Sequence, residues 1–181
     1  MTSSLSLDEL VKRGAGDLSR YVEREHAPSS PLEWLGVAVT RMPGLMATAH
    51  TADDVARRAR PGGTAIRERL VDALARELGV AAGIVEQARM RLEQRHPDCV
   101  GDETGPEVYA ELLEIANRNA TRLSETMIAS YASFLGGAIE AAGALAEADD
   151  GIRDVRAQQL EAALSNTLGG LLAYARLVAA D

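Results

Sequence analysis

Several residue types are scarce in this chain, and each scarcity argues against a class of protein. The only cysteine among 181 residues is Cys99, which rules out an intrachain disulfide and agrees with a reducing compartment. Aromatic residues make up 3% of the chain, so there are few surfaces on which nucleic-acid bases or sugar rings could stack. Lys12 is the only lysine, which leaves Schiff-base chemistry a single candidate nucleophile.

Positive charge is also in short supply. The formal net charge is −8, which disfavours general attraction to nucleic acid or to anionic lipid. The chain has no run of 18 uncharged apolar residues, and its start lacks the basic and apolar regions of a secretion signal. We therefore expect a cytoplasmic protein with no membrane span.

Apolar residues recur at steps of three and four along most of the chain, and no segment between turn signals alternates in the manner of a strand. This pattern predicts an all-α fold, a helical bundle of about six helices in a single domain over residues 1–181. We expect residues 1–97 to supply the N-terminal helices and residues 106–181 to form a long C-terminal antiparallel helix hairpin.

The predicted hairpin turns at Ala148–Gly151, between two long apolar stripes. Both helices rise by about 1.5 Å per residue, so residues whose numbers sum to about 300 should lie opposite each other. Gly136-Gly137 would then face Ala162-Ala163 in a close helix approach, and Tyr131 would cover Gly169-Gly170. The alternative for Gly136-Gly137 is a simple kink. Leu and Ala residues left uncovered by the hairpin would also suit a homodimer face.

Glycine, proline and capping residues predict where the N-terminal helices begin and end. Ser6–Glu9 and Ser30–Glu33 have the form of capping boxes. We expect Pro43-Gly44 to bend or end the helix that starts near Pro31. Gly79 is expected to cap one helix, which a further helix over residues 80–95 would follow.

Two Glu-x-x-His pairs, Glu23 with His26 and Glu93 with His96, form the first chemical lead. Residues at i and i+3 share a helix face, so each pair can present a carboxylate and an imidazole to one ion. The spacing resembles the ferritin-like superfamily, which implies a di-iron site. That superfamily also needs bridging glutamates, and here they would have to come from elsewhere in the chain. The candidates are Glu68, Glu125 and Glu140.

Two other interpretations of these histidines stay open. His26, His96 and Cys99 could make a zinc site if two helices end at the same pole. Histidines at helix C-termini are also expected simply because they interact favourably with the helix dipole and the last carbonyl groups.

The second lead is the segment from residue 75 to residue 88, Ala-Arg-Glu-Leu-Gly-Val-Ala-Ala-Gly-Ile-Val-Glu-Gln-Ala. It resembles the helix-turn-helix of bacterial transcription regulators, with Leu78-Gly79-Val80 at the turn. In that family the second helix enters the major groove of DNA. Gln87 would be the only side chain suited to hydrogen bonding with a DNA base. The negative charge of Glu86 would face the negatively charged phosphates.

Several common catalytic motifs are missing from the sequence: the phosphate-binding glycine loop, the Gly-x-Ser-x-Gly elbow and Cys-x-x-Cys. We therefore expect a non-catalytic accessory or regulatory protein that binds a protein partner or a small ligand, as a homodimer. The first alternative is a metal-dependent enzyme that uses iron or zinc at Glu23, His26, Glu93 and His96. The second alternative is a helix-turn-helix DNA-binding regulator.

Overall fold

The computed structural model describes residues 28–58, 63–99 and 123–180. This part of the chain contains four long α-helices, one short 3-10 helix and no strand. They are α2 (Pro31–Arg58), α3 (Gly63–Arg95), η1 (Pro97–Cys99), α5 (Leu123–Ala146) and α6 (Arg153–Ala180). The all-α prediction is confirmed for these residues.

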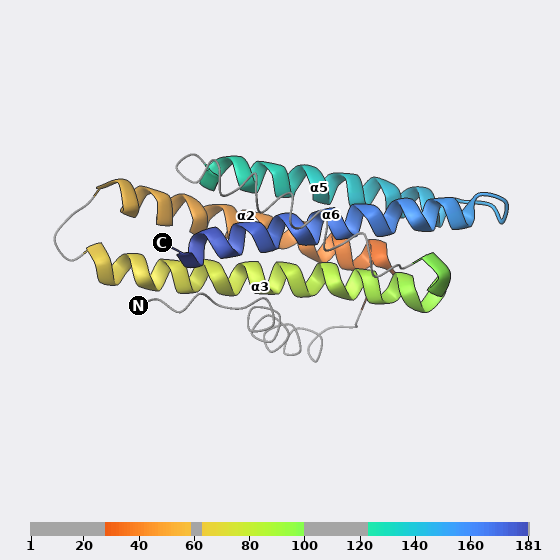
Figure 1. Ribbon diagram of the computed structural model, residues 1–181, viewed down its shortest axis with the longest axis horizontal. Coiled ribbons are helices and arrows are strands. Elements are labelled where there is room, and N and C mark those ends of the chain that lie inside the picture. Colours follow the sequence, from red (N-terminus) through yellow and green to blue (C-terminus); the bar gives the residue numbers. More distant parts are fainter. Residues whose placement is uncertain (1–27, 59–62, 100–122, 181) are drawn as a thin grey trace.

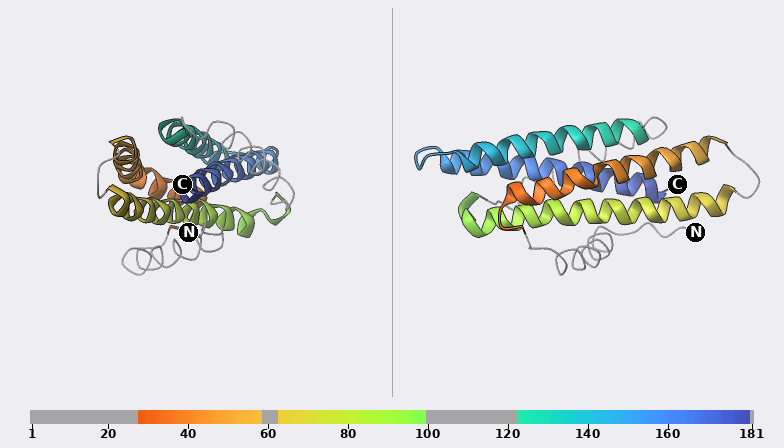
Figure 2. Two further views of the ribbon diagram at one scale, coloured as in Figure 1. Left: turned by 60° about the vertical axis from the view of Figure 1, so that its left-hand side comes forward. Right: turned by 180° about the vertical axis from the view of Figure 1, so that it is seen from behind.

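The four helices form an elongated bundle (Figures 1 and 2). Helix α2 packs against α3 and α5, and α6 also packs against α3 and α5. Helices α2 and α3 run in opposite directions, as do α5 and α6, whereas α3 and α5 run in the same direction (Figure 1). The start of α2, the end of α3, the end of α5 and the start of α6 therefore lie toward one end of the bundle. We call this end the closed pole, because the tight 147–152 turn lies there.

The expected number of about six helices is not what the described residues show, for two reasons. The first predicted helix lies outside them. The two helices predicted on either side of Gly79 are one continuous helix, α3, and α2 likewise continues through Pro43-Gly44. The predicted helix end at Gly79 is therefore wrong, and α2 does not end at Pro43-Gly44.

Packing explains why these breakers do not end their helices. A proline costs roughly 3 kcal/mol in a helix interior and a glycine about 1 kcal/mol. Leu45 and Ala49 lie beyond Pro43 and are as deeply buried as Trp34 and Leu35 before it. Each buried aliphatic or aromatic side chain contributes about 1.5–3 kcal/mol, so continuing the helix buries more apolar surface than the breaker costs.

The start of α2 agrees with the predicted capping box. Ser30 Oγ accepts a hydrogen bond from the backbone N–H of Glu33 at 3.2 Å. The Glu33 carboxylate accepts hydrogen bonds from the backbone N–H of Ser29 at 2.6 Å and from its hydroxyl at 3.1 Å. The pKa of Glu33 is lowered, mainly by the Ser29 backbone hydrogen bond and then by its hydroxyl. The cap therefore fixes where the chain enters the closed pole.

The turn between α5 and α6 lies where the sequence predicts it, at residues 147–152. Asp149 Oδ1 accepts hydrogen bonds from the backbone N–H groups of Gly151 at 3.1 Å and Ile152 at 3.2 Å. An aspartate that bonds its own backbone in this way stabilises a tight turn. Helices α5 and α6 are therefore adjacent and antiparallel over residues 123–180, whereas residues 106–122 of the predicted hairpin lie outside the described part.

The contacts between α5 and α6 differ in detail from those predicted. A Cβ added to Gly170 would lie 3.4 Å from the ring of Phe134, so Phe134, rather than Tyr131, covers this glycine. Gly136 and Gly137 are exposed, and a Cβ on either would meet nothing within 4 Å. The predicted close approach at Gly136-Gly137 is wrong, because this side of α5 faces away from α6.

The apolar core runs along the inner faces of all four helices. Its fully buried large side chains include Trp34 and Leu35 of α2, Ile84 and Leu92 of α3, and Leu160 of α6. Residues Ile128–Ala146 of α5 are also apolar and long enough to cross a membrane by composition, with 28% of that stretch buried. A helix that lines the core of a soluble protein can have the same composition, so this finding alone does not locate the protein.

Candidate functional site

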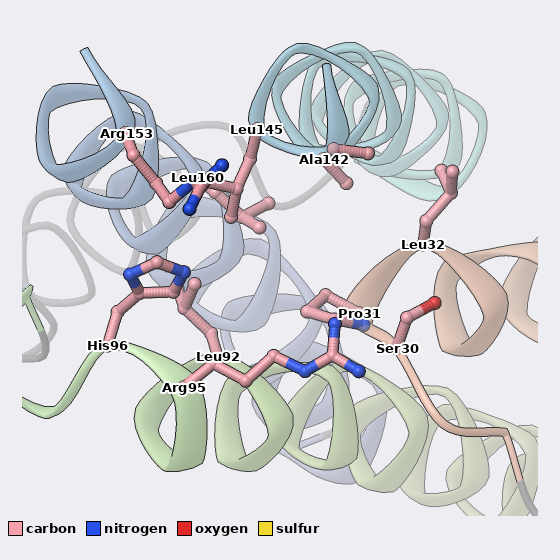
Figure 3. Close-up of a pocket in the computed structure, with 11 residues that line it drawn as sticks. Ser30, Pro31, Leu32, Leu92, Arg95, His96, Ala142, Leu145, Arg153 and Leu160 are labelled. Carbon is pink, nitrogen blue, oxygen red and sulfur yellow. The ribbon is translucent and has the colours of Figure 1, made fainter. Parts of the chain in front are cut away.

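A cavity of about 420 Å³ lies at the closed pole, where all four helices contribute (Figure 3). Its volume falls within the range of small-molecule sites, which is about 300–1,000 Å³. Three lining residues come from the start of α2, three from the end of α3, three from the end of α5 and two from α6. They are Ser30, Pro31, Leu32, Leu92, Arg95, His96, Ala142, Leu145, Ala146, Arg153 and Leu160.

Most of the lining is apolar. Leu92 and Leu160 are fully buried and Ala142 is 4% exposed, so these side chains form a dry inner wall. In Figure 3, Leu145 extends into the same space from α5, and Leu32 extends toward α5 from α2. An apolar wall of this kind favours the non-polar part of a ligand.

The remaining lining side chains carry donors and positive charge. Arg95, His96 and Arg153 line the cavity, and none of the eleven lining residues is acidic. The whole chain has 27 acidic and 19 basic residues, so its net charge is negative, whereas the charged side chains that line the cavity are basic. The cavity therefore favours an anionic group over a cationic one.

Both guanidinium groups are held by backbone carbonyl groups. Arg153 Nη2 donates to the carbonyl of Ala148 at 3.0 Å, and its Nη1 lies 2.8 Å from Oδ1 of Asp150. Arg95 Nη2 donates to the carbonyl of Ser29 at 3.2 Å. Each guanidinium has five N–H donors, so these contacts fix its position and leave other donors for a ligand.

Helix dipoles do not determine whether this cavity prefers a negatively or a positively charged ligand. The N-termini of α2 and α6 and the C-termini of α3 and α5 contribute to the same cavity. An N-terminus carries a partial positive charge and a C-terminus a partial negative charge of similar size. Their effects largely offset each other, so the side chains of Arg95, His96 and Arg153 set the preference for an anion.

The predicted metal residues are only partly within the described chain. Glu23 and His26 lie outside it. Glu93 is exposed near the end of α3, and His96, which follows that helix, is partly buried and lines the cavity. The His96 backbone N–H donates to the carbonyl of Leu92 at 2.8 Å, which continues the helical turn as far as His96.

Within residues 28–58, 63–99 and 123–180, no three His, Cys, Asp or Glu side chains are grouped so that they could hold a metal ion. Of the three carboxylates predicted to complete such a site, Glu140 is exposed on α5, and the side chains of Glu68 and Glu125 lie outside the described part. The site of two Glu-x-x-His pairs, with iron or zinc, stays a prediction because half of it cannot be placed.

The helix-turn-helix prediction over residues 75–88 is wrong in its geometry. These residues lie inside α3 with no turn at Leu78-Gly79-Val80. Every residue from Leu78 to Val85 is buried, including Ala81 and Ala82, which would have begun the recognition helix. A helix that reads DNA must present its N-terminal side chains to the groove, and here they are covered.

A second polar cluster lies between α3 and α6, and the sequence did not predict it. Glu161 is 4% exposed and its Oε1 accepts a hydrogen bond from the Ser165 hydroxyl at 2.8 Å. Arg89 Nε lies 3.8 Å from the same oxygen, and its Nη1 lies 3.8 Å from Glu86. The serine hydrogen bond and the nearby Arg89 guanidinium reduce the cost of burying the Glu161 carboxylate.

Sequence reasoning also missed both arginines of the cavity. One signal was available for Arg153: a positive charge at the first residue of a helix opposes the helix dipole, and a side chain placed there at a cost often has another role. No comparable signal marks Arg95, because a positive charge in the last turn of a helix is the ordinary arrangement.

Comparison with known proteins identifies no relative for this chain: no family model matches it, and neither the curated proteins nor the solved structures include a significant match.

Proposed function

We propose that this protein is a non-catalytic helical module that binds a small ligand in the cavity of the closed pole and acts as an accessory or regulatory protein. Its body is the helical bundle built on the C-terminal hairpin expected over residues 106–181, which α5 and α6 support from residue 123 to residue 180. The observation that carries the proposal is a cavity of about 420 Å³ whose wall is formed by all four described helices.

The position of the cavity suits regulation better than catalysis. A ligand there would touch the starts of α2 and α6 and the ends of α3 and α5 at once. Anything that binds the folded chain and not the unfolded chain stabilises it. A ligand at this junction would therefore tighten the relative positions of the helices, which a partner protein could sense. The lining contains no hydroxyl nucleophile paired with a base, since His96 and Ser30 approach from different helices on different sides of the space.

The proposal is tested by filling the cavity. Ala142→Leu adds a larger side chain to the inner wall, and Ala162→Leu, at an exposed position of α6 outside the cavity lining and the proposed dimer face, is the control. Isothermal titration with octanoate and with 1-octanol should show one saturable site in the wild-type chain and in the control, and none in Ala142→Leu. Circular dichroism confirms that each variant is folded. Saturable binding that survives in folded Ala142→Leu would contradict the proposal.

The homodimer is part of the same proposal, and the outer faces of α2 and α5 support it. Val39 and Met46 lie seven residues apart on α2 and are 44% and 42% exposed. The exposed side of α5, which packs next to α2, carries small residues. These are Ala129, Ala132, Ser133, Gly136 and Gly137. Large apolar side chains of one copy could insert over the small residues of the other in a two-fold arrangement.

Light scattering coupled to size-exclusion chromatography tests the dimer. Val39→Glu should convert a dimer to a monomer because it places a charge in the apolar face. Val155→Glu on α6, where the valine is 55% exposed, is the control and should leave the mass unchanged. A wild-type chain that runs as a monomer would contradict this part of the proposal.

A further inference from the structure

The chemistry of the cavity also restricts the ligand. We propose that it binds a small amphiphilic anion, a carboxylate or phosphate monoester on a short aliphatic body, with the anionic group between Arg153 and His96 and the aliphatic body against Leu92, Leu160 and Ala142. This inference rests on the proposed ligand-binding function and goes further by assigning the charge and the orientation of the ligand.

The anionic end is assigned by the positions of the donors. In Figure 3, Arg153 reaches into the cavity from α6 and His96 reaches into it from the end of α3, on the same side of the space. An imidazole offers at least one N–H donor whether or not it is charged. A guanidinium matches the oxygens of a carboxylate or phosphate with two parallel hydrogen bonds. The two side chains together can therefore hold one anionic group.

The Arg153 guanidinium is positioned before any ligand arrives. Its hydrogen bond to the Ala148 carbonyl ties it to the 147–152 turn, which Asp149 stabilises through two backbone hydrogen bonds. Its acidic neighbour Asp150 has a side chain that is 93% exposed, and an ion pair so open to water contributes little. Asp150 therefore leaves Arg153 able to bind a second anion.

Arg95 has a different place in the site. Its guanidinium extends toward Ser30 and Pro31, and it donates to the Ser29 carbonyl. It also lies close enough to Glu33 to contribute, as the smallest of several causes, to the lowered pKa of that carboxyl. Arg95 thus partly compensates an acidic side chain outside the cavity, and we assign it a smaller share of ligand binding than Arg153.

The aliphatic end is assigned by burial. Leu92 and Leu160 are fully buried and line the cavity from α3 and α6, and Ala142, which is 4% exposed, lines it from α5. These side chains offer no hydrogen-bond partner to a polar group, and burying a polar group without a partner is costly. The polar end of a ligand is therefore excluded from this wall, which fixes the orientation of an amphiphile.

Four probes of equal chain length test the inference: octanoate, octyl phosphate, 1-octanol and octylammonium, titrated calorimetrically below their critical micelle concentrations. Both anions should bind at least about tenfold more tightly than 1-octanol, because a charge-assisted hydrogen bond adds about this factor or more. Octylammonium should bind most weakly. The two anions distinguish a carboxylate site from a phosphate site.

Three variants assign the roles. Arg153→Gln should reduce the preference for octanoate over 1-octanol to about threefold or less. Arg153→Lys should keep part of that preference, because the charge is retained. Arg156→Gln, on the same helix and outside the cavity lining, is the control and should leave the preference unchanged. The ratio of the two affinities is insensitive to a general loss of stability, which lowers both.

The outcomes separate the two proposals. If all four probes bind equally and Ala142→Leu abolishes their binding, the cavity is a ligand site and the assigned anion preference is wrong. If Arg153→Gln leaves the preference intact, the assignment of Arg153 is wrong. If none of the probes binds, both the inference and the proposed function on which it rests are overturned.

Discussion

A pair of closely spaced glycines lies in the middle of both α3 and α5: Gly79 and Gly83 in α3, and Gly136 and Gly137 in α5. The α3 glycines are buried within an eight-residue stretch, residues 78–85, in which every position is buried. The α5 glycines are exposed, and no atom lies within 4 Å of where their Cβ atoms would be. The comparison teaches that small residues in a helix do not by themselves predict close packing.

The difference follows from what surrounds each helix. The inner side of α3 packs against α2 and α6, whereas α5 buries a single side and leaves residues 129, 132, 133, 136, 137 and 140 in solvent. Closely spaced glycines therefore occur both in α3, a core helix of 33 residues, and in α5, a helix of 24 residues with a free face. In the proposed homodimer, a second copy would cover this free face.

The largest expected effect comes from removing side-chain volume in the buried part of α3. Ile84 is fully buried and Ile66, on the same helix, is 55% exposed. Ile84→Ala should lower the free energy of unfolding by about 2–5 kcal/mol, because it removes buried methylene groups and leaves a cavity. Ile66→Ala should change it by no more than about 0.5 kcal/mol. Urea denaturation followed by circular dichroism measures both, and equal effects would show that α3 is not the core helix.

The next effect comes from the polar cluster between α3 and α6. Glu161→Gln removes a charge that is 4% exposed and lies near Arg89, and it should lower the unfolding free energy by about 1–3 kcal/mol. Glu140→Gln, at an exposed position of α5, is the matched control and should be nearly neutral. The same denaturation measurement applies. A neutral Glu161→Gln would show that the ion pair contributes no stability.

Replacing the exposed glycines of α5 should stabilise the protein. In the Val39→Glu background, where we expect a monomer, Gly136→Ala and Gly137→Ala should each raise the unfolding free energy by about 0.5–1 kcal/mol, because alanine loses less backbone entropy in a helix and its Cβ meets no neighbour within the chain. Thermal denaturation at several protein concentrations measures the change. A loss of stability from either variant would break the comparison, because it would mean that the outer face of α5 is closely packed.

The smallest effect concerns the buried side of α5. Burial raises the pKa of the Tyr131 hydroxyl above its ordinary value near 10, and this hydroxyl is buried without a hydrogen-bond partner in the described structure. Below pH 10 the hydroxyl is neutral in both states. Above pH 10 it ionises more readily in the unfolded chain, so the unfolded chain binds fewer protons and stability falls as pH rises.

Tyr131→Phe should therefore be more stable than the wild type at pH 8 by up to about 1 kcal/mol, since it removes an unpaired buried hydroxyl. It should also lose less stability between pH 9 and pH 11. Denaturation curves across that range compare the two proteins. An unchanged pH dependence in Tyr131→Phe would show that Tyr131 does not titrate differently in the folded chain.

The sequence predicted the fold class well and the individual helix boundaries less well. Apolar spacing indicated helices throughout, the Ser30–Glu33 cap and the turn near Asp150 lie where they were expected, and the helical class is confirmed for the described residues. Pro43 and Gly79 do not end their helices because the cost of a proline or glycine in a helix interior is about 1–3 kcal/mol. The buried side chains on both sides of each residue together contribute more than this.

The candidate site could not be predicted from the sequence because its residues are far apart along the chain. Ser30, His96, Ala142 and Arg153 come together only because four helix ends contribute to one cavity. One residue of the predicted metal-binding pair Glu93 and His96 does line the cavity. It is His96, which was selected as a metal ligand and not as part of a ligand pocket. The site is determined by how far each helix is shifted along its neighbours. That shift depends on contacts between residues distant in sequence, which a local sequence pattern does not show.

The central claim is that a ligand binds inside the closed pole and not on the exposed face of α5. Its most direct test is a titration of the isotope-labelled protein with octanoate, followed by amide ¹H–¹⁵N correlation spectra. We expect saturable shifts concentrated at residues 30–32, 92–96, 142–146 and 153–160. Shifts concentrated instead at residues 129–137, or no saturable shift at all, would contradict it.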